Sequence, residues 1–170
     1  MAVYKVVQYP NPVLLKPAAA VGSIGQKERL LVRDMIDTMR AQKGVGLAAN
    51  QIGVAKRIFV ASPGSEPGKE LVFFNPQIIA RSGQVTEEEG CLSVAGVYER
   101  VKRHRRVKLR AMTLDGRTVE VEAEGLLARI FQHETDHLNG GLFVHRLGFL
   151  KKRKVLSELG RSRGRVIGAE

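Results

Sequence analysis

The chain has 170 residues, with 28 Lys plus Arg against 17 Asp plus Glu, which gives a formal net charge of +11. Its hydrophobic fraction of 44% and charged fraction of 26% are ordinary for a globular protein and exclude a mostly disordered chain. The longest stretch without a charge, residues 44–55, has 12 residues and is too short to span a bilayer.

The N-terminus and the cysteine content predict a cellular compartment. The first nine residues lack both a long apolar core and a small-residue cleavage site, so we expect no signal peptide. They also differ from the Arg- and Ser-rich stretch of an organelle transit sequence. Cys91 is the single cysteine, so no internal disulfide can form. We therefore expect a cytoplasmic protein without membrane association.

The first half of the chain begins with a turn-rich entry and continues with one helix and several short strands. Residues 27–42 carry a helical stripe that includes Leu31 and Met35, and Gly44 follows as a helix stop. Two segments rich in strand formers, 57–61 and 71–74, are separated by a cluster of turn residues. A further short strand is predicted at 77–80.

The clearest strand signal is an alternation of apolar and charged residues over 107–124. A two-residue turn in the middle would mix the two faces of the hairpin. A three-residue loop that ends at Gly116 instead places opposite charges across from each other: Arg110 with Glu120, and Lys108 with Glu122. It also gives Gly116 the left-handed conformation that such loops need. We prefer this second register.

After Gly125 the apolar period becomes helical and predicts a helix over 126–139, closed by two glycines. A basic helix is expected over 147–159, and residues 160–170 are expected to form a frayed tail. Short strands grouped apart from helices favour an α+β fold with mainly antiparallel pairing. No repeat or linker divides the chain.

Fifteen of the 28 basic residues fall in two stretches, 100–110 and 146–165. Such runs form either a solvated face or a patch that faces nucleic acid, and the sequence gives these two interpretations about even weight. With three Tyr, six Phe and no Trp, an aromatic platform for single strands is not expected.

His133 and His137 stand four residues apart inside the predicted 126–139 helix. At about 100° per residue they lie on nearly one face, so both imidazoles can reach one metal ion. Glu134 lies one step around the helix, where it can touch a metal-bound water. The alternative is two surface histidines with a carboxylate between them, which the flanking apolar residues disfavour.

A catalytic metal site usually has three protein ligands and one open position. Three side chains are candidates for the third ligand: His145, which lies beyond the helix stop; Glu158, on the predicted basic helix; and Cys91. A lone cysteine is often an inert buried residue. Cys91 nevertheless follows a glycine and has the polar neighbours Glu89 and Ser93, which favours a functional thiolate.

Three motifs resemble the signatures of the peptide deformylase family, in the family's order and spacing: Gly44-Val-Gly-Leu-Ala-Ala-Asn-Gln51, Glu89-Gly-Cys-Leu-Ser93 and Gln132-His-Glu-Thr-Asp-His-Leu138. The resemblance extends from about Tyr9 to Phe143. It implies a catalytic domain over 1–146, with 147–170 as a basic C-terminal helix and tail of the same domain. The implied fold is α+β, with mainly antiparallel strands around a central metal-binding helix.

The resemblance also implies roles for individual residues. The metal ligands would be Cys91, His133 and His137, and Glu134 would be the acid/base. The Gln51 side chain and the Leu92 N–H would bind the oxyanion. Substrate-binding residues are expected at Gly44, Val45, Gly46, Gly90, Leu126 and Ile130. For the apolar members of this set, plain core packing is the competing interpretation.

The implied reaction is hydrolysis of the N-formyl group of formyl-methionyl nascent peptides, with release of formate. The implied cofactor is one divalent ion per chain, Fe²⁺ in the native state, with Zn²⁺, Ni²⁺ or Co²⁺ as replacements. We expect a monomer that meets the ribosome transiently and binds no specific nucleic acid sequence. The alternatives are a zinc endopeptidase with Glu158 as ligand, or a ribosome- or RNA-associated module with a structural metal.

Three positions depart from the family pattern. Ala95 stands where many members have Pro, and His145 replaces an acidic residue. Arg129 lies on the helix where members commonly have an apolar residue near the substrate pocket. This last change bears on side-chain preference in the pocket, and an Arg side chain is long enough to extend outward from it.

Overall fold

The computed structural model describes residues 2–62, 64 and 68–164. Its helices are α1 (Gln26–Ala41), α2 (Gly125–Leu138) and α3 (Phe149–Gly164), with 3₁₀ turns at Pro12–Leu14, Ala49–Ile52 and Phe143–Arg146. Its strands are β1 (Gly46–Ala48), β2 (Ile58–Ala61), β3 (Leu71–Ser82), β4 (Val85–Gly90), β5 (Tyr98–Arg103), β6 (Arg106–Met112) and β7 (Thr118–Glu124).

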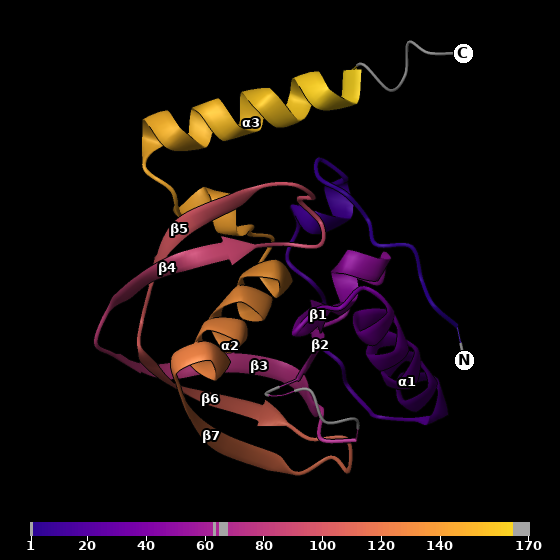
Figure 1. The fold of residues 1–170 in the computed structure, drawn as a ribbon. Coiled ribbons are helices and arrows are strands. Elements are labelled where there is room, and N and C mark those ends of the chain that lie inside the picture. Colours follow the sequence, from indigo (N-terminus) through magenta and orange to yellow (C-terminus); the bar gives the residue numbers. More distant parts are fainter. Residues whose placement is uncertain (1, 63, 65–67, 165–170) are drawn as a thin grey trace.

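Helix α2 lies between two antiparallel sheets (Figure 1). One sheet has five strands in the order β1-β2-β3-β6-β7, and the other is the β4–β5 hairpin. Helix α1 packs beside β1 and β2, and α3 crosses above the hairpin. The prediction of an α+β fold with antiparallel strands around a central helix is confirmed.

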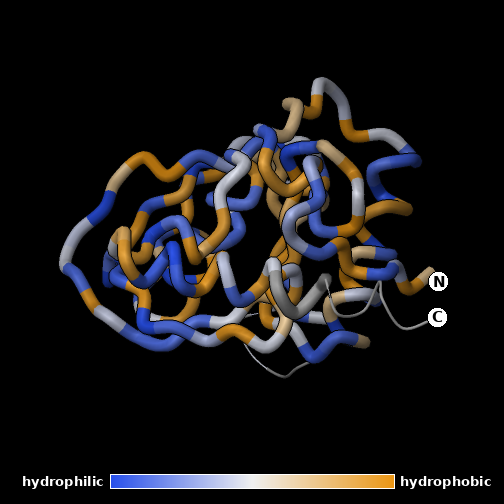
Figure 2. The backbone as a smooth tube through the Cα atoms, turned by 90° about the horizontal axis from the view of Figure 1, so that it is seen from above, coloured by the Kyte–Doolittle hydropathy of each residue, from blue (hydrophilic) through white to orange (hydrophobic). Residues whose placement is uncertain are grey.

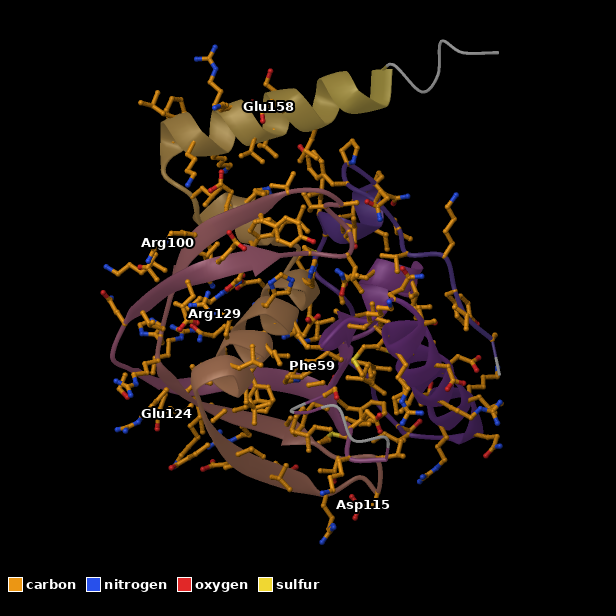
Figure 3. The ribbon with its side chains drawn as sticks, in the orientation of Figure 1. Phe59, Arg100, Asp115, Glu124, Arg129 and Glu158 are labelled. Carbon is orange, nitrogen blue, oxygen red and sulfur yellow. The ribbon has the colours of Figure 1, made fainter. Side chains whose placement is uncertain are left out.

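Strand β2 is buried on both faces and joins the two main parts of the core. Phe59 packs toward α2, where its ring centroid is 5.3 Å from that of Phe73 and 5.8 Å from that of Phe131 (Figure 3). Ile58 and Val60 point the other way, into the cluster formed with α1. A strand covered on both faces needs a continuous apolar run, and residues 58–61 provide one.

Two predicted strands, at 71–74 and 77–80, are one strand in the structure. β3 continues through Asn75 and Pro76 with shifts in its pairing to β6. Asn75 adopts a positive φ of 51°, and its side-chain amide exchanges two hydrogen bonds of 2.8 Å with the backbone of Val21. The prediction of two separate strands was wrong. The hydrogen bonds to Val21 stabilise the irregular backbone at Asn75, and no local sequence pattern reports such a tertiary contact.

The hairpin formed by β6 and β7 has the predicted register. Arg110 pairs with Glu120 and Lys108 with Glu122, and Gly116 has a φ of +83°. The C-terminal helix differs from its prediction, because α3 begins at Phe149 and continues to Gly164. Residues 165–170 of the predicted tail lie outside the described part of the chain.

Apolar and polar residues alternate along most of the chain in Figure 2, and no long apolar stretch stands out. This distribution fits elements that bury one face and expose the other. Within the described residues, no helix is long and apolar enough to cross a membrane.

Candidate metal centre

Cys91, which follows β4, meets two histidines of α2. Its Sγ lies 3.2 Å from Nε2 of His137, and that nitrogen lies 3.2 Å from Nε2 of His133. All three donor atoms lie within 4.8 Å of one another. Tetrahedral coordination with bonds of about 2.0–2.3 Å places neighbouring ligand atoms roughly 3.3–3.6 Å apart. The three side chains therefore fit a single divalent cation.

The local sequence explains how the thiolate reaches the helix. Gly90 ends β4, and a Cβ at this position would come within 2.6 Å of Cε1 of Tyr98 on the paired strand. Glycine therefore lets the Tyr98 ring lie against the backbone just before Cys91. The two histidines come from successive turns of α2, where a spacing of four residues keeps them on one face.

Glu89 supports the centre from behind. Its Oε2 lies 3.1 Å from Nδ1 of His133, which places the ring proton on Nδ1 and leaves Nε2 free for a metal. Arg103 donates to the same carboxylate through Nε at 2.6 Å and Nη2 at 2.8 Å. Burial opposes ionisation of Glu89, but the hydrogen bonds from Arg103 and His133 hold its pKa well below the ordinary value.

His137 is fully buried, and burial lowers its pKa. A neutral imidazole is the form that binds metals. The side chain of Asn50 donates from Nδ2 to the main-chain carbonyl of His137 at 2.5 Å. Asn50 lies in the 3₁₀ turn Ala49–Ile52, so this bond joins the first sequence motif to the third.

Glu134 is 4% exposed, and burial raises its pKa to about 7. Its Oε2 is buried and has no hydrogen-bond partner among the described residues. The other oxygen lies against Gly46 of β1, so close that a Cβ at that position would clash with the carboxylate. A buried carboxyl with a pKa near neutrality can both take and return a proton.

Gln51 points its amide nitrogen toward the thiolate. Its Oε1 accepts from the Ala48 N–H at 2.9 Å, which fixes the orientation of the amide. Nε2 then lies 3.2 Å from Oγ of Ser93 and 3.6 Å from Sγ of Cys91. The Gln51 amide N–H groups therefore point toward the position where the three metal ligands converge.

A cavity of about 680 Å³ opens over these groups. The cavity walls include eleven of the twelve predicted site residues: Gly44, Val45, Gly46, Gln51, Gly90, Cys91, Leu92, Leu126, Ile130, His133 and Glu134. His137 lies behind the wall with no exposed surface. Val45 and Leu126 are about half exposed, whereas Ile130 is buried. Predicted site residues from three separate segments, 44–51, 90–92 and 126–134, therefore line one cavity.

The other ligand candidates lie elsewhere. Neither Glu158 nor His145 belongs to the cluster of ligand atoms found among the described residues. Glu158 is on α3, which crosses above the β4–β5 hairpin (Figure 3). Nδ1 of His145 accepts a hydrogen bond from the Leu142 N–H at 3.1 Å. Cys91 is therefore the third ligand.

The Arg129 side chain does not extend outward into solvent. Its side chain is 7% exposed and bonds to carboxylates of β4. Sequence reasoning also missed the roles of Glu89 and Asn50, which contact His133 and His137. The signal for Glu89 was its place two residues before the ligand cysteine, and for Asn50 its place beside Gln51.

Comparisons with known proteins agree with this site. Residues 3–153 match the family model for polypeptide deformylase. A curated peptide deformylase from Acidobacterium capsulatum is 45% identical over 161 residues, covering 94% of this chain and 95% of the relative. A Legionella pneumophila peptide deformylase structure superposes with a TM-score of 0.90 at 38% identity, covering 99% and 100% of the chains. The peptide deformylase structure from Thermus thermophilus superposes with a TM-score of 0.85 at 43% identity, covering 94% of this chain and 96% of that chain.

The fold and the Cys-His-His centre thus define a metal-dependent hydrolase. The chain belongs to the peptide deformylase family, whose enzymes remove the formyl group from N-terminal methionine.

Proposed function

We propose that Cys91, His133 and His137 hold one divalent ion, Fe²⁺ in the native enzyme, and that Glu134 is the acid/base of deformylation. The observation that carries this proposal is the convergence of a thiolate and two imidazoles within 4.8 Å, beside a buried carboxyl at one cavity. Thiolate and imidazole donors suit Fe²⁺ and also accept Zn²⁺, Ni²⁺ or Co²⁺. All these groups come from one chain, in line with a monomeric enzyme.

The bound ion supplies Lewis acidity and lowers the pKa of water at the site. Glu134 takes a proton from the attacking water while the water oxygen bonds to the formyl carbon. The Gln51 Nε2–H and the Leu92 N–H donate to the oxyanion that develops, and losing one such donor typically costs about 3–4 kcal/mol. Glu134 returns the proton to the amine nitrogen as the C–N bond breaks, which releases formate and a free N-terminus.

The edge of the five-stranded sheet suits an extended peptide. β1 is the terminal strand of that sheet and pairs with β2 alone among the described strands, and Gly44 and Val45 lead into it. Backbone at Val45 and Gly90 flanks the cavity and can pair with a substrate as an added strand. Leu126, Ile130 and the His133 ring supply an apolar wall for the methionine side chain.

The test is formate release from formyl-Met-Ala by metal-loaded protein, with acetyl-Met-Ala as the matched substrate control. We expect turnover with the formyl substrate only. Glu134→Gln keeps the size of the side chain and should lower kcat about 10²–10⁴-fold while the protein still binds one metal ion. Turnover equal to wild type in a folded Glu134→Gln variant would refute the role of Glu134.

We further propose that the enzyme works in the cytoplasm and meets the ribosome through α3. Four of the seven basic residues in the stretch 100–110 form ion pairs with three glutamates of β7: Arg105 and Arg106 with Glu124, Lys108 with Glu122, and Arg110 with Glu120. On α3, by contrast, Lys152, Arg153 and Lys154 have no carboxylate partner among the described residues. Such a cluster suits ribosomal RNA phosphates without reading sequence.

Replacing Lys152, Arg153 and Lys154 by Gln should reduce ribosome co-sedimentation at low salt. Truncating the segment would be a poor test, because Val155 and Leu159 are part of the hydrophobic core. The matched control replaces Arg105, Arg106 and Arg110 by Gln, which removes the same charge from the paired stretch. Equal ribosome binding by the α3 variant and wild type would refute this contact.

A further inference from the structure

Arg129 lies on α2 one turn before His133, at the i and i+4 spacing that puts both on one face of the helix. Its guanidinium points toward the β4–β5 hairpin, whereas Arg100 on the hairpin extends outward (Figure 3). The hairpin shares no backbone pairing with the five-stranded sheet in the described chain. Short connections join its two ends to β3 and β6, and beyond them its position relative to α2 depends on side-chain contacts.

Arg129 makes three such contacts, and they reach both strands of the hairpin. Nε donates to Oε2 of Glu87 at 3.1 Å, and Nη1 donates to Oε1 of Glu89 at 2.5 Å, both on β4. Nη1 also donates to the carbonyl of Val101 on β5 at 3.2 Å. One guanidinium group thus forms hydrogen bonds with both strands of the hairpin, on the face that packs against α2.

Neutralising Glu89 does not require Arg129. Arg103 already meets that carboxylate with two hydrogen bonds, at 2.6 and 2.8 Å, and is itself fully buried. Arg129 is a second cation on this carboxylate and also pairs with Glu87. The distinct contribution of Arg129 is geometric. Arg103, on β5, links Glu89 to Asp136 near the C-terminal end of α2, whereas Arg129 belongs to α2 itself and bonds to the hairpin two turns earlier.

The geometry points to Arg129 as a positioning residue that sets the distance between the Cys91 thiolate and the histidine pair. Glu89 lies two residues before Cys91 and also contacts His133, so Arg129 and His133 attach the same carboxylate to α2 at two points one turn apart. Together with the Arg103–Asp136 ion pair further along α2, these two attachments fix both the separation and the rotation of the strand against the helix. The inference rests on the proposed metal centre and is independent of the substrate.

Arg129→Met removes the contacts and keeps much of the side-chain length, while Arg103 still neutralises Glu89. Cobalt-loaded protein gives a readout other than activity, because the absorption of Co²⁺–thiolate and its ligand-field bands report the geometry of the centre. We expect Arg129→Met to bind Co²⁺ about 10-fold more weakly than wild type and to show altered absorption bands. This loss is at the low end of the range for residues that hold metal ligands in place. Arg129→Lys should restore part of the affinity.

The control is Arg110→Met, which removes an exposed ion pair with Glu120 far from the centre and should leave Co²⁺ affinity and spectrum unchanged. If Arg129→Met only lowers the melting temperature of the metal-free protein, with wild-type affinity and bands, the inference is overturned. Should Arg129→Met not fold, Glu87→Gln removes the carboxylate charge from one contact at a half-exposed position and should weaken Co²⁺ binding two- to threefold. Wild-type binding by Glu87→Gln would then overturn it. Failure of wild-type protein to release formate, with Co²⁺ bound normally, would refute only the proposed reaction.

Discussion

Gly46 lies directly against the carboxylate of Glu134, with no room for a side chain between β1 and α2. A Cβ at position 46 would clash with an oxygen and with Cδ of Glu134, and would come within 3.0 Å of Cγ2 of Ile130. Because Glu134 is buried and contacts this glycine on the strand side, the edge strand and the carboxyl proposed as acid/base are positioned together. Gly46 of the first motif therefore makes room for Glu134 of the third motif because glycine has no side chain.

Gly46→Ala should displace Glu134 and lower kcat/KM for formyl-Met-Ala about 100-fold, since a shift of roughly 1 Å in a catalytic group can cost that much. Metal content should not change, because neither Gly46 nor Glu134 is a metal ligand. Gly22→Ala is the control, since a Cβ at Gly22 meets nothing within 4 Å. A wild-type rate in Gly46→Ala would show that the carboxylate adjusts without loss.

The choice of Cys91 over Glu158 as the third ligand predicts opposite results for two variants. Cys91→Ala should lose stoichiometric metal binding, because two imidazoles alone hold a divalent ion weakly. Glu158→Gln, on α3, should keep one metal ion per chain. Elemental analysis of the purified proteins makes this comparison. Metal loss in Glu158→Gln with retention in Cys91→Ala would instead support the endopeptidase alternative.

Local patterns predicted the elements whose partners lie nearby in the chain. Opposite charges determined the register of β6 and β7, and the helical period determined α2 together with the two histidines. The third ligand was different, because residues 91 and 133 are far apart in sequence and periodicity does not connect them. The resemblance to a family supplied that choice, and the geometry agrees with it.

The β4–β5 hairpin was missed for a physical reason. β4 reads Val85-Thr-Glu-Glu-Glu-Gly90 and carries almost no apolar residue to mark a buried face. Its inward side is covered by guanidinium groups instead, since Arg103 and Arg129 both meet Glu89. A face buried by ion pairs has no hydrophobic alternation, so single-sequence patterns do not report it.

Asn50→Ala should lower the free energy of unfolding by about 1–3 kcal/mol, because it removes a buried hydrogen bond and leaves a small cavity. The His137 carbonyl keeps a second donor, the Gly140 N–H at 3.0 Å, so the protein should still fold. Urea denaturation measures the change. Asn139→Ala, which removes an exposed contact to Arg57 at the same end of α2, should cost less than 1 kcal/mol. Equal losses in both variants would contradict a special role for Asn50.

The ion pair between Glu28 and Lys56 predicts an acid-dependent contribution to stability. Lys56 donates to Glu28 at 2.7 Å and the Gly25 N–H donates at 3.0 Å, and these bonds lower the pKa of Glu28 from 4.5 to about 2. A carboxyl with a lowered folded-state pKa stabilises the protein above its unfolded-state pKa, and that contribution disappears as the pH falls through the folded value. Wild type should therefore exceed Glu28→Gln in stability by a constant amount above about pH 5. The difference should shrink between about pH 4.5 and pH 2, as measured by urea denaturation at fixed pH values. A difference that does not change with pH across this range would show that the pairing acts through contacts other than the carboxylate charge.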